Sequence, residues 1–173
     1  MNSMQAEEQQ RIFDGWLKSH RGLLFKVVRA YAFTPPDQED LFQEIATQVL
    51  RSVPNFRGES AVTTWIYRVA LNAAIAWTRQ ERKHRGGKQS VDGVEPSILQ
   101  PSATSDPRVE WLYAQIRALN EIDRSLTLLM LDGFSYKEMA SMLGITESYV
   151  GVKINRIKAQ LTSKSKEELR HAV

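Results

Sequence analysis

Residues 134–158 read FSYKEMASMLGITESYVGVKINRIK, and they describe two short helices joined by a tight turn. Ser135 and Glu138 form the S-x-x-E pattern of a capping box, which marks the start of the first helix. Gly144 supplies the left-handed residue that ends a helix at low cost. Thr146 is a suitable N-cap for a second helix. The stretch therefore predicts a helix, a glycine turn and a second helix.

The second of these helices has an apolar face and a basic, polar face. Its apolar side chains recur at helical spacing and are Val150, Ile154, Ile157 and Leu161. The side chains expected to point away from that face, or to lie on its flanks, are Ser148, Tyr149, Val152, Lys153, Asn155 and Arg156. A short helix followed by a basic one is the helix-turn-helix arrangement, whose second helix enters the DNA major groove. We therefore expect residues 135–158 to bind DNA; the simpler alternative is a helical hairpin with a solvated basic face.

The amino-acid composition excludes several kinds of protein and of functional site. The chain has 173 residues, 42% of them hydrophobic and 25% charged, which is typical of a globular protein. It has no cysteine, so disulfides, thiolate metal sites and cysteine nucleophiles are excluded. The sequence contains no Gly-rich phosphate loop, nucleophile elbow, signal peptide or apolar run long enough to cross a membrane. We therefore expect a soluble, cytoplasmic protein that is not an enzyme and needs no metal or cofactor.

The hydrophobic period is helical along the chain, which predicts an all-α protein. We expect two small helical domains, over residues 8–85 and 108–165, joined by a flexible linker over 86–107 that is rich in Gly, Pro and Ser. A long helix is expected to close the first domain. Its predicted buried stripe consists of Val62, Trp65, Ile66, Val69, Ala73 and Ala76.

Two polar helix faces stand out in the first domain. One lies opposite the apolar stripe of the helix that follows Pro35-Pro36 and carries Asp40, Gln43, Glu44, Thr47 and Arg51. The other lies on the long helix and carries Arg68, Asn72, Arg79 and Arg82. The turn before the long helix contains Phe56 and Arg57. Cations that follow phosphates, beside aromatic and amide groups that receive unstacked bases, indicate a site for single-stranded nucleic acid.

Four motifs, in order, carry a resemblance to a known family: D-x-x-D-L-x-Q-E, F-R-G-E, W-I-Y-R-V-A-x-N-x-A and the helix-turn-helix. The segment from Asp37 to Arg85 resembles region 2 of the extracytoplasmic function (ECF, group IV) sigma factors of bacterial RNA polymerase, in the sigma-70 family. The segment from Ala118 to Leu161 resembles their region 4. The chain departs from the family pattern at Leu71, Ala76 and Gly151.

The resemblance implies a role for each face. The residues expected to bind the β′ clamp of core RNA polymerase are Asp40, Gln43, Glu44 and Thr47. Those expected to bind the melted minus-10 element of promoter DNA are Phe56, Arg57, Arg68, Asn72, Arg79 and Arg82. The helix-turn-helix, with Ser148, Tyr149, Val152, Lys153, Asn155 and Arg156, would bind the minus-35 element. Further expected partners are the polymerase β flap and an anti-sigma factor.

A second class of function stays open at this point. The chain could be a conventional repressor or activator that binds duplex DNA through residues 135–160 alone. Its first domain would then sense a ligand or form a dimer, and would need an apolar cavity or dimer stripe. The two polar faces of the first domain favour the sigma factor.

Overall fold

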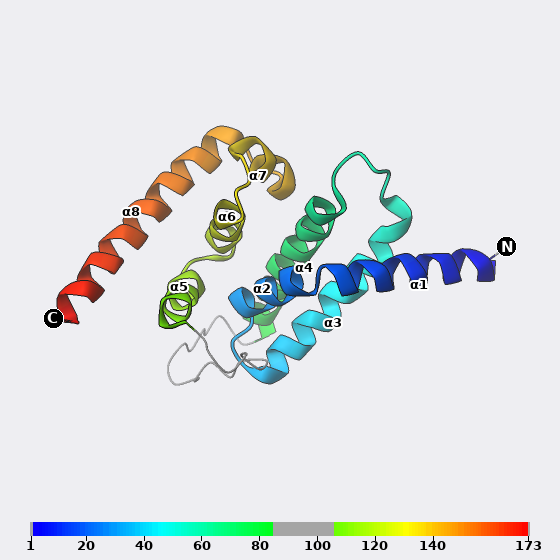
Figure 1. The fold of residues 1–173 in the computed structure, drawn as a ribbon, viewed down its shortest axis with the longest axis horizontal. Helices are drawn as coiled ribbons and strands as arrows, with labels where there is room; N and C mark the ends of the chain where they lie inside the picture. The colour runs from blue at the N-terminus through cyan, green and yellow to red at the C-terminus, as the bar shows by residue number, and fades with distance from the viewer. Residues whose placement is uncertain (1, 85–105, 173) are drawn as a thin grey trace. The chain divides into compact units, whose positions relative to one another are not determined.

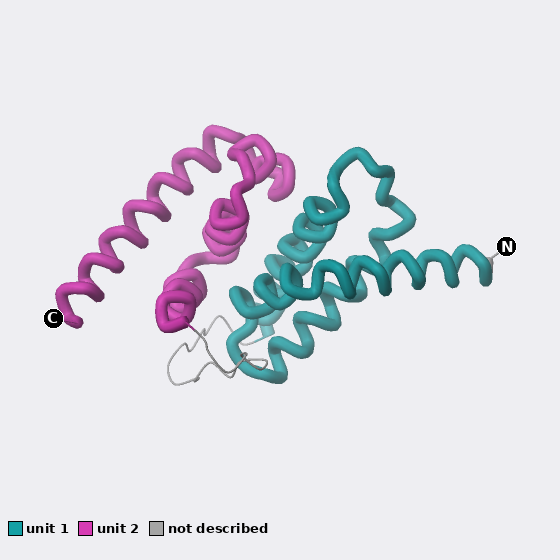
Figure 2. Tube along the Cα trace, in the orientation of Figure 1, with its two compact units in different colours: residues 1–104 teal, residues 105–173 magenta. Residues whose placement is uncertain are grey.

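The computed structural model describes residues 2–84 and 106–172. The chain divides into two compact units, residues 1–104 and 105–173 (Figure 2). The helices of the first unit are α1 (Asn2–Ser19), α2 (Arg21–Tyr31), α3 (Pro35–Ser52), the 3-10 helix η1 (Val53–Asn55) and α4 (Val62–His84). Those of the second are α5 (Pro107–Arg117), α6 (Glu121–Leu131), α7 (Tyr136–Leu143) and α8 (Glu147–His171). The predicted all-α class is confirmed (Figure 1).

Element boundaries follow local signals in the sequence. Helix α3 begins after Thr34, whose Oγ1 accepts a hydrogen bond from the Asp37 backbone N–H at 3.3 Å, and prolines occupy its first two positions. Almost all of the predicted linker, 86–107, lies outside the described residues. Its last two residues, Asp106 and Pro107, form the N-cap and the first residue of α5. Helix α8 continues to His171, past the predicted domain end at 165.

The core of the first unit forms where α2, α3 and α4 pack against one another. Helix α2 contributes Leu24, Val27 and Val28, each at most 1% exposed. From α3 come the fully buried Leu41 and Ile45. Gln38 is also buried, and its side-chain amide donates to the Ala32 carbonyl at 3.1 Å. This bond holds the chain between α2 and α3, so that both helices face α4.

The predicted buried stripe of α4 is wrong in part. Ala76 is exposed, and Val62, Trp65 and Val69 are only half-buried. The buried face includes the predicted Ile66 and Ala73 but is centred on Tyr67, Ala70, Leu71, Ala74 and Thr78. Because α4 contacts both α2 and α3, it buries more than one stripe, and its Trp65–Ala76 edge remains accessible.

The second unit is held by a buried arginine between α5 and α6. Arg124 is 3% exposed. Its Nε donates to the Leu119 carbonyl at 2.7 Å, and its Nη2 donates to the Arg117 carbonyl at 2.8 Å. Carbonyls at a helix C-terminus lack partners within the helix. Arg124 therefore caps the end of α5 and ties it to α6.

The helix-turn-helix is built as the sequence predicts. The Ser135 backbone N–H donates to Glu138 Oε2 at 2.7 Å, and the Glu138 N–H donates to Ser135 Oγ at 3.1 Å. Hydrogen bonding to the Glu138 carboxylate from the Ser135 backbone, and secondarily from the Ser135 side chain, holds the pKa of this carboxyl below its usual value. Gly144 ends α7 with φ of 67°, and Thr146 Oγ1 accepts from the Tyr149 N–H at 3.2 Å. The predicted capping box, glycine turn and second cap are thus confirmed.

We expect Gly151→Ala to stabilise the protein by about 0.5–1 kcal/mol, because glycine inside a helix costs conformational entropy. A Cβ at Gly151 would lie 3.6 Å from Cε2 of Tyr136, an ordinary contact. Urea unfolding of the full chain, followed by circular dichroism, measures the change. The matched control is Gly144→Ala, expected to destabilise by about 1–2 kcal/mol because φ is positive there. A loss of stability in Gly151→Ala would show that the Tyr136 ring does not accommodate a methyl group.

Candidate nucleic-acid interface

Two tryptophans of α4 hold this helix against α3. Trp65 Nε1 donates to Ser52 Oγ at 3.0 Å, and Trp77 Nε1 donates to Asp40 Oδ2 at 2.8 Å. Asp40 and Ser52 are as far apart along α3 as Trp65 and Trp77 are along α4. The helices therefore run antiparallel, with an indole bond at each end of their shared edge.

A cavity of about 550 Å³ lies along this shared edge. Its lining from α3 and η1 is Glu44, Gln48, Arg51, Ser52 and Asn55. Its lining from α4 is Trp65, Arg68, Val69, Asn72, Ala73 and Ala76. The structure therefore brings Glu44, predicted to face the polymerase, together with Arg68 and Asn72, predicted to bind DNA. Amide, guanidinium and carboxylate groups around one opening offer both donors and acceptors to the edge of a base.

A second cavity, of about 390 Å³, lies beneath the turn between η1 and α4. It is lined by Asn55, Phe56, Arg57, Glu59, Ser60, Trp65 and Arg68. Three of these residues, Asn55, Trp65 and Arg68, also line the first cavity, so the two cavities adjoin. The predicted minus-10 residues Phe56, Arg57 and Arg68 meet here. Arg79 and Arg82 are exposed farther along α4 and line neither cavity.

Phe56 lies between two tryptophans. Its ring centroid lies 5.3 Å from that of Trp16, in an edge-to-face arrangement. It lies 5.5 Å from that of Trp65, and those two ring planes are at 60° to each other. Trp65 was predicted to lie in the core. It is instead half-buried and lines both cavities. The sequence did not indicate Trp16 for this site, because a position in α1 gives no local signal of contact with the turn.

The four residues predicted to bind the polymerase are all exposed on α3. Three of their side chains, those of Asp40, Glu44 and Thr47, are nevertheless held by intramolecular bonds. Thr47 Oγ1 donates to the Gln43 carbonyl at 2.8 Å, and Glu44 Oε1 accepts from Gln48 Nε2 at 2.9 Å. Asp40 accepts the indole bond from Trp77. The face therefore presents largely pre-oriented polar groups.

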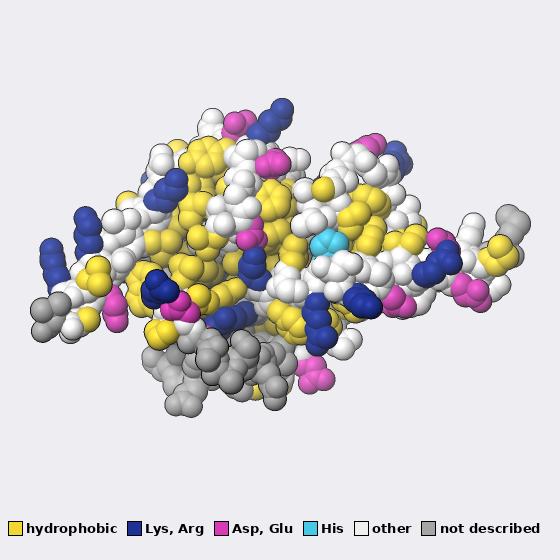
Figure 3. Space-filling model, in the orientation of Figure 1, with side chains coloured by type: hydrophobic (Ala, Val, Ile, Leu, Met, Phe, Trp, Pro, Cys, Tyr) yellow, Lys and Arg dark blue, Asp and Glu magenta, His cyan; other side chains and the backbone are white. Residues whose placement is uncertain are grey.

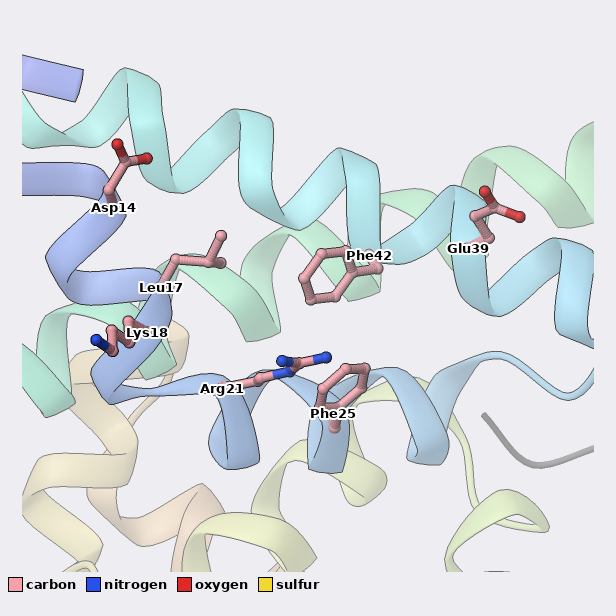
Figure 4. A pocket seen from close by; sticks show the side chains of 7 residues that line it. All are labelled: Asp14, Leu17, Lys18, Arg21, Phe25, Glu39 and Phe42. Atoms are coloured by element: carbon pink, nitrogen blue, oxygen red, sulfur yellow. The ribbon is translucent and has the colours of Figure 1, made fainter. Parts of the chain in front are cut away.

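A third cavity, of about 830 Å³, lies among α1, α2 and α3 (Figure 4). Phe25 and Phe42 stack beside it, with ring centroids 5.5 Å apart and planes at 17°. The Arg21 guanidinium lies 5.2 Å from the Phe25 centroid. The rim carries both signs of charge, from Asp14, Glu39 and Lys18 as well as Arg21. This cavity contains none of the predicted site residues.

In the second unit, α8 presents the predicted DNA-binding face. Ser148, Tyr149, Val152, Asn155 and Arg156 are exposed, whereas the apolar face of Val150, Ile154 and Ile157 is buried. Lys and Arg side chains project along α8 at the left of the space-filling view (Figure 3). The helix therefore offers a polar surface with accessible cations.

Lys153 differs from the other predicted DNA-binding residues. Its side chain is 19% exposed, and its Nζ lies 3.3 Å from Oδ1 of Asp123 on α6. The ammonium also lies 5.5 Å from the Tyr149 ring centroid. Since Asp123 Oδ1 is buried and makes no well-aligned hydrogen bond, Lys153 supplies its neutralising charge. Lys153 thus anchors α8 to α6, a role that helical spacing did not reveal.

Other kinds of site find little support in the part of the chain that the structure describes. No group of three or more His, Asp or Glu residues within residues 2–84 and 106–172 is arranged to hold a metal ion. Among the same residues, no helix combines the length and the apolar character that a bilayer crossing requires.

Comparison with known proteins assigns the two units. The family model for sigma-70 region 2 matches residues 16–84, and that for sigma-70 region 4 matches residues 110–161. The ECF RNA polymerase sigma factor SigM of Mycobacterium tuberculosis is 26% identical over 149 residues, covering 86% of this chain and 74% of SigM. The ECF RNA polymerase sigma-E factor of Escherichia coli is 27% identical over 141 residues, covering 74% of this chain and 73% of that protein.

Solved structures agree on the fold. The sigma factor RpoE of Bartonella quintana, in complex with the anti-sigma factor NepR, matches with a TM-score of 0.73 and 17% identity, over 90% of this chain and 98% of that one. CnrH, in complex with the cytosolic domain of CnrY, matches with a TM-score of 0.61 and 18% identity, over 95% of this chain and 94% of CnrH. A region 2 match over the first unit does not favour a ligand-sensing or dimerisation domain there. The chain belongs to the sigma-70 family, as one of its ECF RNA polymerase sigma factors.

Proposed function

We propose that this protein binds core RNA polymerase, directs it to promoters and promotes opening of the duplex at the start of transcription. It acts by binding, without covalent chemistry of its own. The single observation that carries the proposal is the shared edge of α3 and α4. There, exposed acids and amides of α3 lie beside two adjoining cavities that contain Arg68 and Asn72.

Each face has a part in this function. Asp40, Gln43, Glu44 and Thr47 dock on the β′ clamp. The adjoining cavities take unpaired bases of the minus-10 element, and Arg79 and Arg82 follow its phosphates. Bases trapped outside the stack shift the equilibrium between duplex and bubble toward the bubble.

The second unit binds the minus-35 element in the major groove and contacts the β flap. Ser148, Tyr149, Val152, Asn155 and Arg156 meet the DNA. Lys153 acts mainly by holding α8 on α6, since Asp123 engages its ammonium. The structurally similar RpoE and CnrH were solved with NepR and CnrY respectively. We expect an anti-sigma factor to regulate this protein too.

The direct test is binding to core RNA polymerase. We expect Asp40→Ala combined with Glu44→Ala to weaken that binding by about 5–30-fold, because exposed ionic contacts contribute about 0.5–1 kcal/mol each. Fluorescence anisotropy with labelled protein and purified core enzyme measures the affinity. Arg108→Ala is the control, because Arg108 forms an exposed ion pair with Asp106, outside both proposed faces. A well-folded double variant that binds as tightly as wild type would show that α3 is not the polymerase-binding helix.

A further inference from the structure

The hydrogen bond between Trp77 and Asp40 has a consequence for polymerase binding. It joins α4, the helix with the proposed DNA-binding groups, to α3, the helix with the proposed polymerase-binding groups. Asp40 itself is exposed, so burial does not select the orientation of its carboxylate. The indole of Trp77 is half-buried and belongs to a helix that packs along α3. The donor therefore has a fixed position, and the acceptor takes its orientation from the donor.

We propose that Trp77 is a positioning residue for Asp40, and that it sets the carboxylate in the orientation that receives a cationic side chain of the polymerase. This inference rests on the proposed function of the α3 face. An exposed aspartate ordinarily loses rotamer freedom when it binds, and this loss weakens association. Because the hydrogen bond from Trp77 already restricts the Asp40 side chain in the free protein, Asp40 loses less rotamer freedom when the polymerase binds.

The chemistry of the pair agrees with this role. A carboxylate has about four acceptor sites on its two oxygens. One indole N–H occupies one of them, so Asp40 retains capacity for a Lys or Arg of the partner. A neutral donor leaves the negative charge in place, whereas an internal cation would have neutralised it. The arrangement orients the charge and preserves its attraction for a cation.

The bond at the other end of the shared edge is different in kind. Trp65 donates to Ser52 Oγ, and Ser52 Oγ donates in turn to the Val49 carbonyl of α3 at 2.7 Å. That pair is neutral and lies on the wall of a cavity. Holding the two helices together thus does not by itself require an acid, and the indole of Trp77 holds a carboxylate on the polymerase-binding face.

A double-mutant cycle tests the inference with the full chain and purified core RNA polymerase. The variants are Trp77→Phe, which keeps an aromatic ring but removes the N–H, Asp40→Ala, and the two combined. Trp111→Phe, in the second unit, controls for loss of an indole elsewhere. We expect Trp77→Phe to weaken core binding by about 2–5-fold at most, because it cannot cost more than the Asp40 contact that it positions. We expect no further weakening when Trp77→Phe is added to Asp40→Ala.

The cycle separates positioning from general destabilisation. If Trp77→Phe binds as tightly as wild type while Asp40→Ala binds weakly, the positioning role is wrong and the polymerase face stands. If Trp77→Phe weakens binding equally in both backgrounds, Trp77 acts through the fold and the inference is overturned. If Asp40→Ala itself binds normally, the assignment of Asp40 to the polymerase face fails, and the inference fails with it.

Discussion

Arg124→Met is expected to destabilise the helix-turn-helix unit by about 3–5 kcal/mol. The change keeps most of the side-chain volume but removes the donors to the Arg117 and Leu119 carbonyls. The Arg117 carbonyl ends α5 and the Leu119 carbonyl lies two residues beyond it, and Arg124 itself is almost fully buried. Water does not readily replace a buried donor, so the carbonyls would bear the cost of desolvation. Small domains are stable by only about 5–15 kcal/mol, so this is a large fraction of the total.

Amide hydrogen exchange in the full chain measures the effect unit by unit. We expect protection of the buried α6 amides, such as those of Leu126 and Leu129, to fall by more than about a hundredfold. Protection in α2–α4 should be unchanged. Arg156→Met is the control, because Arg156 is an exposed arginine of the same unit and its loss should cost at most about 0.5 kcal/mol. Unchanged protection in Arg124→Met would mean that the α5 carbonyls find other donors.

Asn72→Ala and Phe56→Ala are expected to reduce open-complex formation by about 5–150-fold each, the range for one lost contact with an unstacked base. The two should differ in stability. Phe56 packs against Trp16 and Trp65, so its loss should lower the melting temperature. Asn72 is exposed, and its replacement should leave the melting temperature nearly unchanged.

Permanganate footprinting on duplex and on pre-melted promoter templates, with thermal melting alongside, distinguishes the two effects. Base capture offsets the cost of unpairing, so the loss should be larger on duplex than on the pre-melted template. Thr63→Ala is the control, since it lies on the first turn of α4 and lines neither cavity. Full opening of duplex by a stable Asn72→Ala protein would remove Asn72 from the site.

Local signals were sufficient where the interacting groups lie within a few residues of one another. The Ser135–Glu138 box, the left-handed Gly144 and the Thr146 cap are each determined by side chains and backbone of one turn. Hydrophobic period likewise predicted the buried Val150, Ile154 and Ile157. These features established the all-α class and the helix-turn-helix, and the resemblance of the motifs established the family.

The helical spacing of apolar residues alone placed the buried face of α4 incorrectly. A stripe of apolar residues indicates which side of a helix avoids water, but α4 contacts both α2 and α3 and buries a wider surface. Leu71 and Tyr67 are therefore in the core, while Ala76 lies on an accessible edge. An alanine side chain is small enough for either environment, so whether it is buried depends on which helices pack against it.

The sequence by itself determined the family, the helices and the polar faces of this protein; only the tertiary structure decided which side chains from different helices meet. Trp77 with Asp40, Trp16 with Phe56, and Lys153 with Asp123 are each separated along the chain by a turn or by whole helices. Helical spacing relates residues within one helix, typically three or four apart. Contacts between helices depend on how packed surfaces fit in three dimensions, which spacing within one helix does not encode.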